Sequence, residues 1–153
     1  MTQAIPPNQS ASPVLWGEYR CSLDSDGYLL LPAQFSTTTP FVLTKGLDGC
    51  LMLAPQSYFS SLSEKVRALP ISNQLGRLFR RHLFAHALQV IPDEKRRIFV
   101  PDALRTYAGL SDEVILVGND VYLEIWNVNA WLEKQARLID EAISQEDWQL
   151  EGI

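Results

Sequence analysis

Alternating apolar and polar residues predict a strand near the start of the globular sequence. Over residues 16–23, Tyr19, Cys21 and Leu23 alternate with polar side chains, a period of two that is typical of a half-buried strand. Asp26-Gly27 predicts a tight turn because both residues tolerate a positive φ, so residues 28–31 are expected to return as the partner strand of a hairpin. Residues 41–44 and 50–53 predict a second hairpin.

A different period follows and predicts helices. Apolar residues fall at helical spacing between Pro55 and Pro70, and a second helical pattern begins after the capping pair Ser72-Asn73 and extends to about residue 87. A final helix is expected from Val128 to about residue 144, with an apolar stripe formed by Ala130, Trp131, Lys134, Leu138 and Ile139.

The strand pattern occurs twice. Residues 24–32 (DSDGYLLLP) and 93–101 (DEKRRIFVP) both place Asp four residues before a large polar side chain, then three apolar residues and a proline. The copies lie 69 residues apart here, and 73 and 72 residues apart at the two apolar blocks that follow. Each half, at about 70 residues, is too small for a comfortable core, so we expect one pseudo-symmetric domain. The second half should contain strands at 88–91, 97–100, 113–117 and 122–126, a turn at 118–120, and a short helix at 102–107.

Composition limits the class of protein. Apolar runs are too short to span a bilayer and residues 1–14 lack the pattern of a secretory signal, which indicates a cytoplasmic protein without a membrane partner. Cys21 and Cys50 do not have metal-ligand spacing and are expected to be reduced, partly buried thiols.

Charge is divided unevenly along the chain. The net charge of −5 argues against nucleic acid, yet residues 1–101 carry ten Lys and Arg against seven Asp and Glu, while residues 102–153 carry three against eleven. The densest basic cluster is Lys95-Arg96-Arg97, predicted at the tip of a two-stranded ribbon slim enough for the major groove. A solubilising turn is the alternative. In the first copy, Gly27 and Tyr28 occupy the places of Arg96 and Arg97.

Other motifs have simpler interpretations. Arg77, Arg80 and Arg81 form either a second basic strip or surface ion pairs. His82 and His86 have the spacing of a helical metal pair but no evident third ligand, and residues 24–27 resemble a calcium loop without its later carboxylates. No enzyme signature is present, so we expect no enzyme, metal, cofactor or small-molecule substrate.

The chain resembles the MraZ family of bacterial transcriptional regulators over residues 16–131. The residues that carry the resemblance are Gly17-Glu18-Tyr19, Ser22-Leu23-Asp24, Gly27, Leu31-Pro32-Ala33, LTKGLDGCL at 43–51, 93–97 with Pro101, and Tyr107-Ala108-Gly109-Leu110.

The resemblance implies an α+β fold, in which two tandem SpoVT/AbrB-type repeats intertwine as a pseudo-twofold swapped-hairpin β-barrel with flanking helices. The expected divisions are a flexible tail at 1–14, repeats at 15–59 and 88–131, connecting helices at 60–87, and a C-terminal helix with an acidic tail at 132–153. It also implies a ring-like homo-oligomer in the nucleoid, which represses the division and cell-wall gene cluster, its own operon, by binding short direct repeats in double-stranded DNA.

The family's D-x-x-x-R motif falls on Asp93 and Arg97 in the second half, but on Asp24 and Tyr28 in the first, where the arginine is absent. We therefore expect Lys95, Arg96 and Arg97 to be the main DNA-reading group, supported by Arg20, Lys45 and Tyr28, with Asp24, Gly27 and Asp93 supporting the turns. The alternatives are an AbrB-type protein-interaction or antitoxin-like module with weak DNA binding and, third, a metal-dependent hydrolase.

Overall fold

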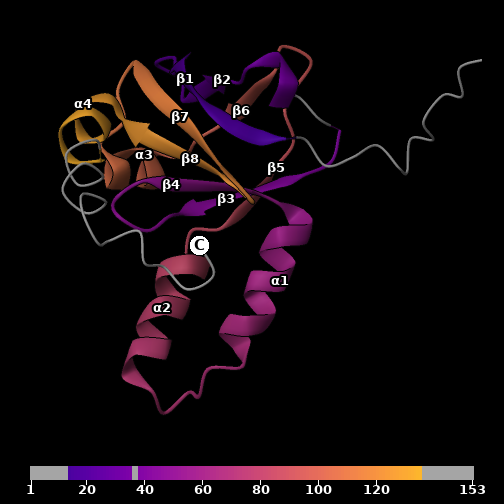
Figure 1. Cartoon of the computed structure of the whole chain (residues 1–153), viewed down its shortest axis with the longest axis vertical. Coiled ribbons are helices and arrows are strands. Elements are labelled where there is room, and N and C mark those ends of the chain that lie inside the picture. Colours follow the sequence, from indigo (N-terminus) through magenta and orange to yellow (C-terminus); the bar gives the residue numbers. More distant parts are fainter. Residues whose placement is uncertain (1–13, 36–37, 136–153) are drawn as a thin grey trace, which may run out of the picture.

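The computed structural model describes residues 14–35 and 38–135 and contains both strands and helices (Figure 1). The predicted tail at 1–14, apart from Val14, and the predicted helix and acidic tail beyond residue 135 lie outside the described residues. The strands are β1 (Leu15–Ser22), β2 (Tyr28–Leu30), β3 (Phe41–Lys45), β4 (Leu51–Pro55), β5 (Leu88–Val90), β6 (Arg97–Phe99), β7 (Glu113–Asp120) and β8 (Leu123–Asn127). The helical segments are a short 3-10 turn (Ala33–Phe35), α1 (Gln56–Arg67), α2 (Gln74–Phe84), α3 (Asp102–Ala108), and α4 (Val128–Ala130), which continues as a π-helical turn (Trp131–Gln135).

The strand order reveals a pseudo-twofold relation between the halves. One antiparallel sheet has the order β1-β7-β8-β4-β3-β5, and β2 pairs with β6 in a separate two-stranded ribbon. In the repeat, β1, β2, β3 and β4 correspond to β5, β6, β7 and β8. Exchanging each strand for its equivalent gives the order β5-β3-β4-β8-β7-β1, which is the same sheet listed from its other edge. Leu29 opposite Ile98, and Met52 opposite Glu124, are 69 and 72 residues apart, the spacings of the repeat itself. The pseudo-twofold axis therefore passes through the β2–β6 ribbon and between β4 and β8.

The predicted hairpin of residues 16–23 with 28–31 is wrong. β1 pairs along its whole length with β7, and only an isolated bridge between Leu23 and Leu29 joins it to β2. Likewise, β5 pairs with β3 and β6 pairs with β2, so Lys95-Arg96-Arg97 does not lie at the tip of a ribbon made by its own two flanking strands. The tight turns exist, but β2 and β6 pair with each other instead of across their turns, and this pairing places Leu29 and Ile98 together in the core.

The expectation of a closed barrel is also corrected. The strands form the six-stranded sheet and the ribbon as two separate hydrogen-bonded units. Pro32 and Pro101 lie just after the ribbon strands, where a residue without an N–H cannot extend a ladder. The predicted hairpins of β3 with β4 and β7 with β8 are confirmed, although β7 extends through Asp120 and the turn comes later than expected.

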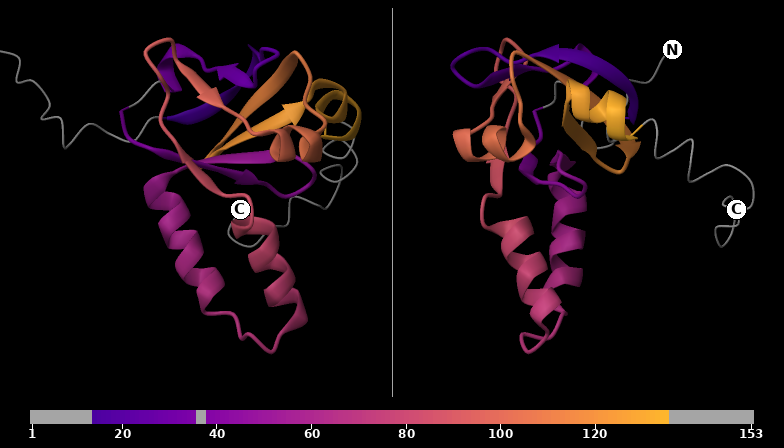
Figure 2. Two further views of the ribbon diagram at one scale, coloured as in Figure 1. Left: turned by 180° about the vertical axis from the view of Figure 1, so that it is seen from behind. Right: turned by 90° about the vertical axis from the view of Figure 1, so that its left-hand side faces the viewer.

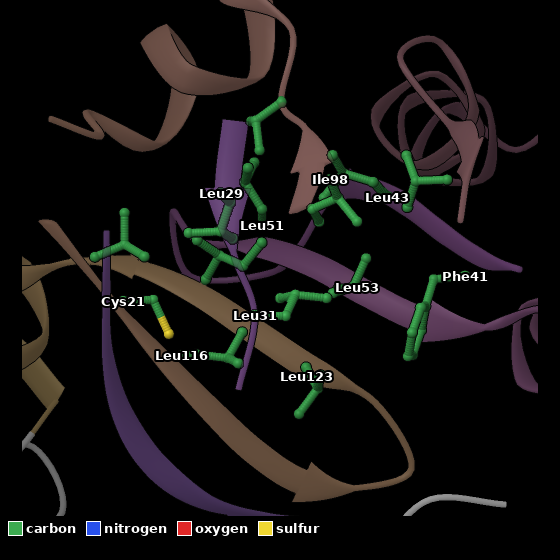
Figure 3. Close-up of a cluster of buried hydrophobic side chains, with 14 of the residues drawn as sticks. Cys21, Leu29, Leu31, Phe41, Leu43, Leu51, Leu53, Ile98, Leu116 and Leu123 are labelled. Carbon is green, nitrogen blue, oxygen red and sulfur yellow. The ribbon is translucent and has the colours of Figure 1, made fainter. Parts of the chain in front are cut away.

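The core lies between the large sheet and the ribbon. Leu29 and Ile98 from the ribbon meet Leu43, Leu53 and other side chains of the large sheet in one buried cluster (Figure 3). The opposite face of β3 and β4 packs through Val42, Met52 and Ala54 against α1 and α2. Coverage of both faces suits the uninterrupted apolar sequence LMLA at 51–54 in β4 and the apolar start of β3, Phe41 to Leu43.

Helices α1 and α2 project together from the sheet on the side away from the ribbon (Figures 1 and 2). The buried Thr44 hydroxyl donates to the Leu83 carbonyl oxygen at 2.6 Å and so ties the end of α2 to β3. Arg80 donates to the carbonyl oxygens of Arg67 and Leu69, and Arg77 to that of Ile71, so these two arginines cap α1 and its connection. Neither forms an ion pair with another described residue.

The two cysteines are free and buried, as predicted. Burial raises the pKa of the Cys21 thiol to about 11, and burial beside Glu124 raises that of Cys50 further. Among the described residues no helix combines the length and apolar character needed to cross a bilayer.

Candidate nucleic-acid interface

The β2–β6 ribbon has one buried face and one outward face. Leu29 and Ile98 point into the core and are 0% and 2% exposed. Because successive strand residues point to opposite sides, the neighbouring residues share the other face. The outward side chains are Tyr28 and Arg97, which are half-buried, and Leu30 and Phe99, which are exposed.

Asp93 organises the turn that leads into β6. Its Oδ1 accepts the backbone N–H groups of Lys95 and Arg97, both at 2.9 Å, while its Oδ2 accepts Nε–H of Arg97 at 3.0 Å. These bonds, that from the Arg97 backbone most of all, hold the pKa of Asp93 below its ordinary value. The carboxylate therefore stays charged at neutral pH and fixes the arginine.

Tyr28 holds Arg97 from the other strand. The guanidinium carbon lies 4.8 Å from the centroid of the Tyr28 ring, a cation–π contact, and that ring also packs on Phe99. Among the described residues, only Asp93 accepts a hydrogen bond from the Arg97 side chain, and it uses Nε. The two terminal nitrogens thus remain available for a fork-shaped acceptor such as a guanine edge or a phosphate.

Arg96 and Arg20 approach the same hollow beside the ribbon. A depression of about 500 Å³ is lined by both arginines together with Leu30, Leu31 and Pro32. Arg20 also forms an exposed salt bridge to Glu113 at 3.3 Å. The structure thus brings Arg96 and Arg20 together beside the ribbon, and Lys95 is exposed on the same turn as Arg96.

Lys45 does not join this group. β3 and β5 are antiparallel with Phe41 opposite Val90 and Leu43 opposite Leu88, so Lys45 lies toward the start of β5, whereas the Arg96 turn follows its end. Its ammonium lies 4.9 Å from the centroid of the Tyr107 ring. A contact of Lys45 with the same stretch of DNA therefore has no support from this geometry.

The first turn has the same backbone design but the opposite charge. Asp24 Oδ1 accepts the N–H groups of Asp26 and Tyr28 at 2.9 Å each, and Gly27 supplies the positive φ of 96°. Residues 24–28 carry two carboxylates and no cation, a net charge of −2, whereas residues 93–97 carry three cations against two carboxylates, a net of +1. The two turns flank opposite ends of the ribbon, because the Leu31 N–H donates to the carbonyl of Arg96 and the Val100 N–H to that of Gly27.

Two residues of the outward face were missed by the sequence reasoning. Leu30 and Phe99, 40% and 41% exposed, belong to the three apolar residues that precede the proline in each copy of the repeat. The available signal was the period of two, since Leu29 and Ile98 must face inward if their neighbours face outward.

Comparison with known proteins identifies relatives over most of the chain. A family model described as "MraZ protein, putative antitoxin-like" matches residues 83–150. Proteins named "Transcriptional regulator MraZ" are 42% identical in Pediococcus pentosaceus, 41% in Thermomicrobium roseum and 40% in Carboxydothermus hydrogenoformans. These matches cover 76%, 84% and 75% of this chain and 83%, 92% and 82% of the relatives.

The chain belongs to the MraZ family. The sequence resemblance is thereby confirmed, and the names of these MraZ relatives describe regulators and not enzymes. Within the described residues, no group of three His, Cys, Asp or Glu side chains is placed to hold a metal ion, and His82 instead lies 2.6 Å from the Gly46 carbonyl oxygen.

Arg96 occupies a conformation that favours glycine, with φ at 63°. We expect Arg96→Gly to raise the free energy of unfolding by roughly 0.5–1 kcal/mol, because a left-handed non-glycine residue costs about 1–2 kcal/mol and glycine loses part of that gain to chain entropy. Urea denaturation measures this difference. Lys95→Gly is the matched control and should destabilise the protein, because Lys95 does not have a positive φ. Equal effects of the two substitutions would contradict the strain at Arg96.

Proposed function

We propose that this MraZ-family protein is a sequence-specific DNA-binding transcriptional regulator whose β2–β6 ribbon enters the major groove. The observation that carries the proposal is the fixed position of Arg97 on the outward face, between Asp93 and Tyr28, with its terminal nitrogens unused by described residues. A two-stranded ribbon fits the major groove, and a forked guanidinium is suited to guanine. The names of the relatives support the same role.

Each cation has a separate task in this proposal. Arg97 contacts a base edge, while Arg96, Lys95 and Arg20 contact the phosphates on the side where the hollow lies. Asp93, Asp24 and Gly27 support the turns. Tyr28 positions Arg97. Because the first turn carries net negative charge, the grip on DNA is stronger at the Arg96 end of the ribbon.

We further propose self-association into a ring that binds short direct repeats. Helices α1 and α2, called here the α1–α2 unit, connect the two repeats in the sequence and so break the pseudo-symmetry of the halves. An interface between two unlike surfaces generates a ring when successive copies close on themselves. Apolar residues are exposed on this unit, with Leu75 at 73% and Leu78 at 56%, beside a hollow of about 600 Å³ that also includes Leu47. Several ribbons on one ring would bind spaced repeats cooperatively.

The regulated target in this proposal is the protein's own operon, the division and cell-wall gene cluster, which the protein represses from the cytoplasm and nucleoid. This part rests on membership of the MraZ family.

A protein-interaction role is the second candidate. The antitoxin-like description of the family model favours it, as does the apolar hollow beside α2, which suits a protein partner as well as another copy. Under that reading DNA binding is weak and insensitive to sequence. The two candidates therefore differ in the first experiment below.

Removing the two turn arginines tests the interface. For Arg96→Ala combined with Arg97→Ala, we expect a loss of affinity for DNA from upstream of the protein's own operon, because both a base contact and a phosphate contact disappear. The slope of log affinity against log salt should become shallower by about 0.9 for each lost phosphate contact, multiplied by the number of ribbons engaged. Gel shifts across a salt series measure both quantities.

A matched control removes the same charge elsewhere. Arg67 and Arg81 are exposed on the α1–α2 unit, away from the ribbon, so Arg67→Ala with Arg81→Ala should keep the wild-type salt slope. If the ribbon variant binds operon DNA as the wild-type protein does, the DNA interface is elsewhere. Binding that is weak for every variant and indifferent to sequence and salt would favour the protein-interaction candidate.

The two turn aspartates provide an internal comparison. Asp93→Asn and Asp24→Asn each remove one negative charge and keep an oxygen for the turn N–H groups, but only Asp93 binds the Arg97 side chain. We expect Asp93→Asn to lower the ratio of specific to random-DNA affinity by up to about fivefold, the upper range for an exposed ion pair. Asp24→Asn should leave that ratio unchanged. Fluorescence anisotropy with both DNAs gives the ratio, and equal effects would argue against positioning by Asp93.

The size of the assembly tests the ring. Light scattering of the wild-type protein should give a mass well above 17.3 kDa, and Leu78→Glu should reduce it, because a charge in the apolar hollow opposes docking of another copy. Ile71→Glu changes an exposed apolar residue that does not line the hollow, and should assemble normally. A monomeric wild-type protein would exclude the ring.

A further inference from the structure

The outward face of the ribbon carries two exposed apolar side chains beside its arginine. Leu30 lies directly opposite Arg97, and Phe99 directly opposite Tyr28. Both Leu30 and Phe99 remain exposed while the ribbon's inner face is fully buried. A surface that contacted only phosphates would have no use for apolar groups here, because phosphate contacts require donors and cations.

We propose that Leu30 and Phe99 read the 5-methyl group of thymine in the major groove, next to the guanine contacted by Arg97. This inference rests on the proposed DNA-binding function and deepens it. Thymine is distinguished in the major groove by its C5-methyl group, and apolar side chains including phenylalanine contact that methyl. In this proposal the outward face of the ribbon recognises guanine through the polar Arg97 and thymine through the apolar Leu30 and Phe99.

The ribbon geometry sets the spacing of the bases. Arg97 and Phe99 are two residues apart on one strand, a rise of about 6.7 Å, which matches roughly two base steps of about 3.4 Å for a ribbon lying along the groove. Leu30, opposite Arg97, is about 5 Å from it between Cβ atoms. The thymines should therefore lie within about two base pairs of the guanine.

The Phe99 side chain is held in place before binding. The Phe99 ring packs on that of Tyr28 with centroids 5.5 Å apart, and Tyr28 in turn holds Arg97. Leu30 lines the same hollow as Arg20 and Arg96, so phosphate contacts of these arginines would bring the leucine into the groove. Of the two ribbon strands, only β6 carries both an arginine and an aromatic residue.

Replacing thymine by uracil tests this inference, because it removes the methyl group and leaves the hydrogen-bonding groups of the base unchanged. The probe is a duplex selected from a random-sequence library by the wild-type protein, with each thymine replaced in turn. We expect about a fourfold loss of affinity for each methyl contacted, from the transfer free energy of one buried carbon group. A separate series with 7-deazaguanine locates the guanine bound by Arg97.

Variants assign the contact to a side chain. In Phe99→Ala or Leu30→Ala, the uracil effect should disappear at one thymine, while Ile91→Ala, an exposed apolar residue outside the ribbon, should keep it. Thermal melting of each variant verifies folding, and the two independent variants keep the test valid if one is unstable. The inference is overturned if the protein binds every uracil-substituted duplex as tightly as the thymine duplex. It is also overturned if uracil lowers the affinity of Phe99→Ala and Leu30→Ala as much as it lowers that of the wild-type protein.

The failure of the proposed function is distinguishable from these results. A wild-type protein that selects no sequence at all refutes DNA recognition itself. A protein that selects a sequence but ignores thymine methyls refutes only this inference. If Phe99→Ala or Leu30→Ala instead changes the mass measured by light scattering, the face is covered by another copy of the chain and the methyl contact is refuted.

Discussion

Backbone pairing between the two halves is the constraint on which the remaining structure depends. Every strand of the first half forms hydrogen bonds with a strand of the second half: β1 with β7, β2 with β6, β3 with β5 and β4 with β8. The ribbon exists only because one strand comes from each half, and its inner residues complete the core over the large sheet. The proposed reading surface is therefore a product of the pairing, since neither half contains it alone.

The pseudo-twofold axis brings equivalent residues into contact with each other. Tyr28 and Arg97 occupy equivalent places in the repeats and meet diagonally on the ribbon at 4.8 Å. Two arginines at these places would put like charges together, which is unfavourable at short range. A tyrosine in one copy replaces that repulsion with a cation–π attraction, so Tyr28 helps to hold Arg97 in place.

The sequence predicted the elements better than their partners. Periods of two and 3.6 located the strands and helices, and Asn73 correctly predicted the start of α2 because its side chain accepts the N–H groups of Leu75 and Gly76. Strand pairing was misassigned because a turn such as Asp26-Gly27 signals only local geometry, whereas Leu15 opposite Asp120 depends on long-range burial. The position of Lys45 relative to the Arg96 turn likewise depends on strand register, because β3 places it toward the start of β5 and the turn follows the end of β5.

The exchange of strands also shapes how the chain folds during synthesis. Leu15 can pair with Asp120 only after Asp120 has been translated, 105 residues later. At ordinary elongation rates this delay is about 5–20 s. During that interval β1 and β2 lack their main partners, and their apolar side chains and free backbone edges are open to other chains. Neighbouring nascent chains on one polysome carry the same second-half strands. The first half of one chain can therefore pair with the second half of a neighbour, which would exchange strands between copies.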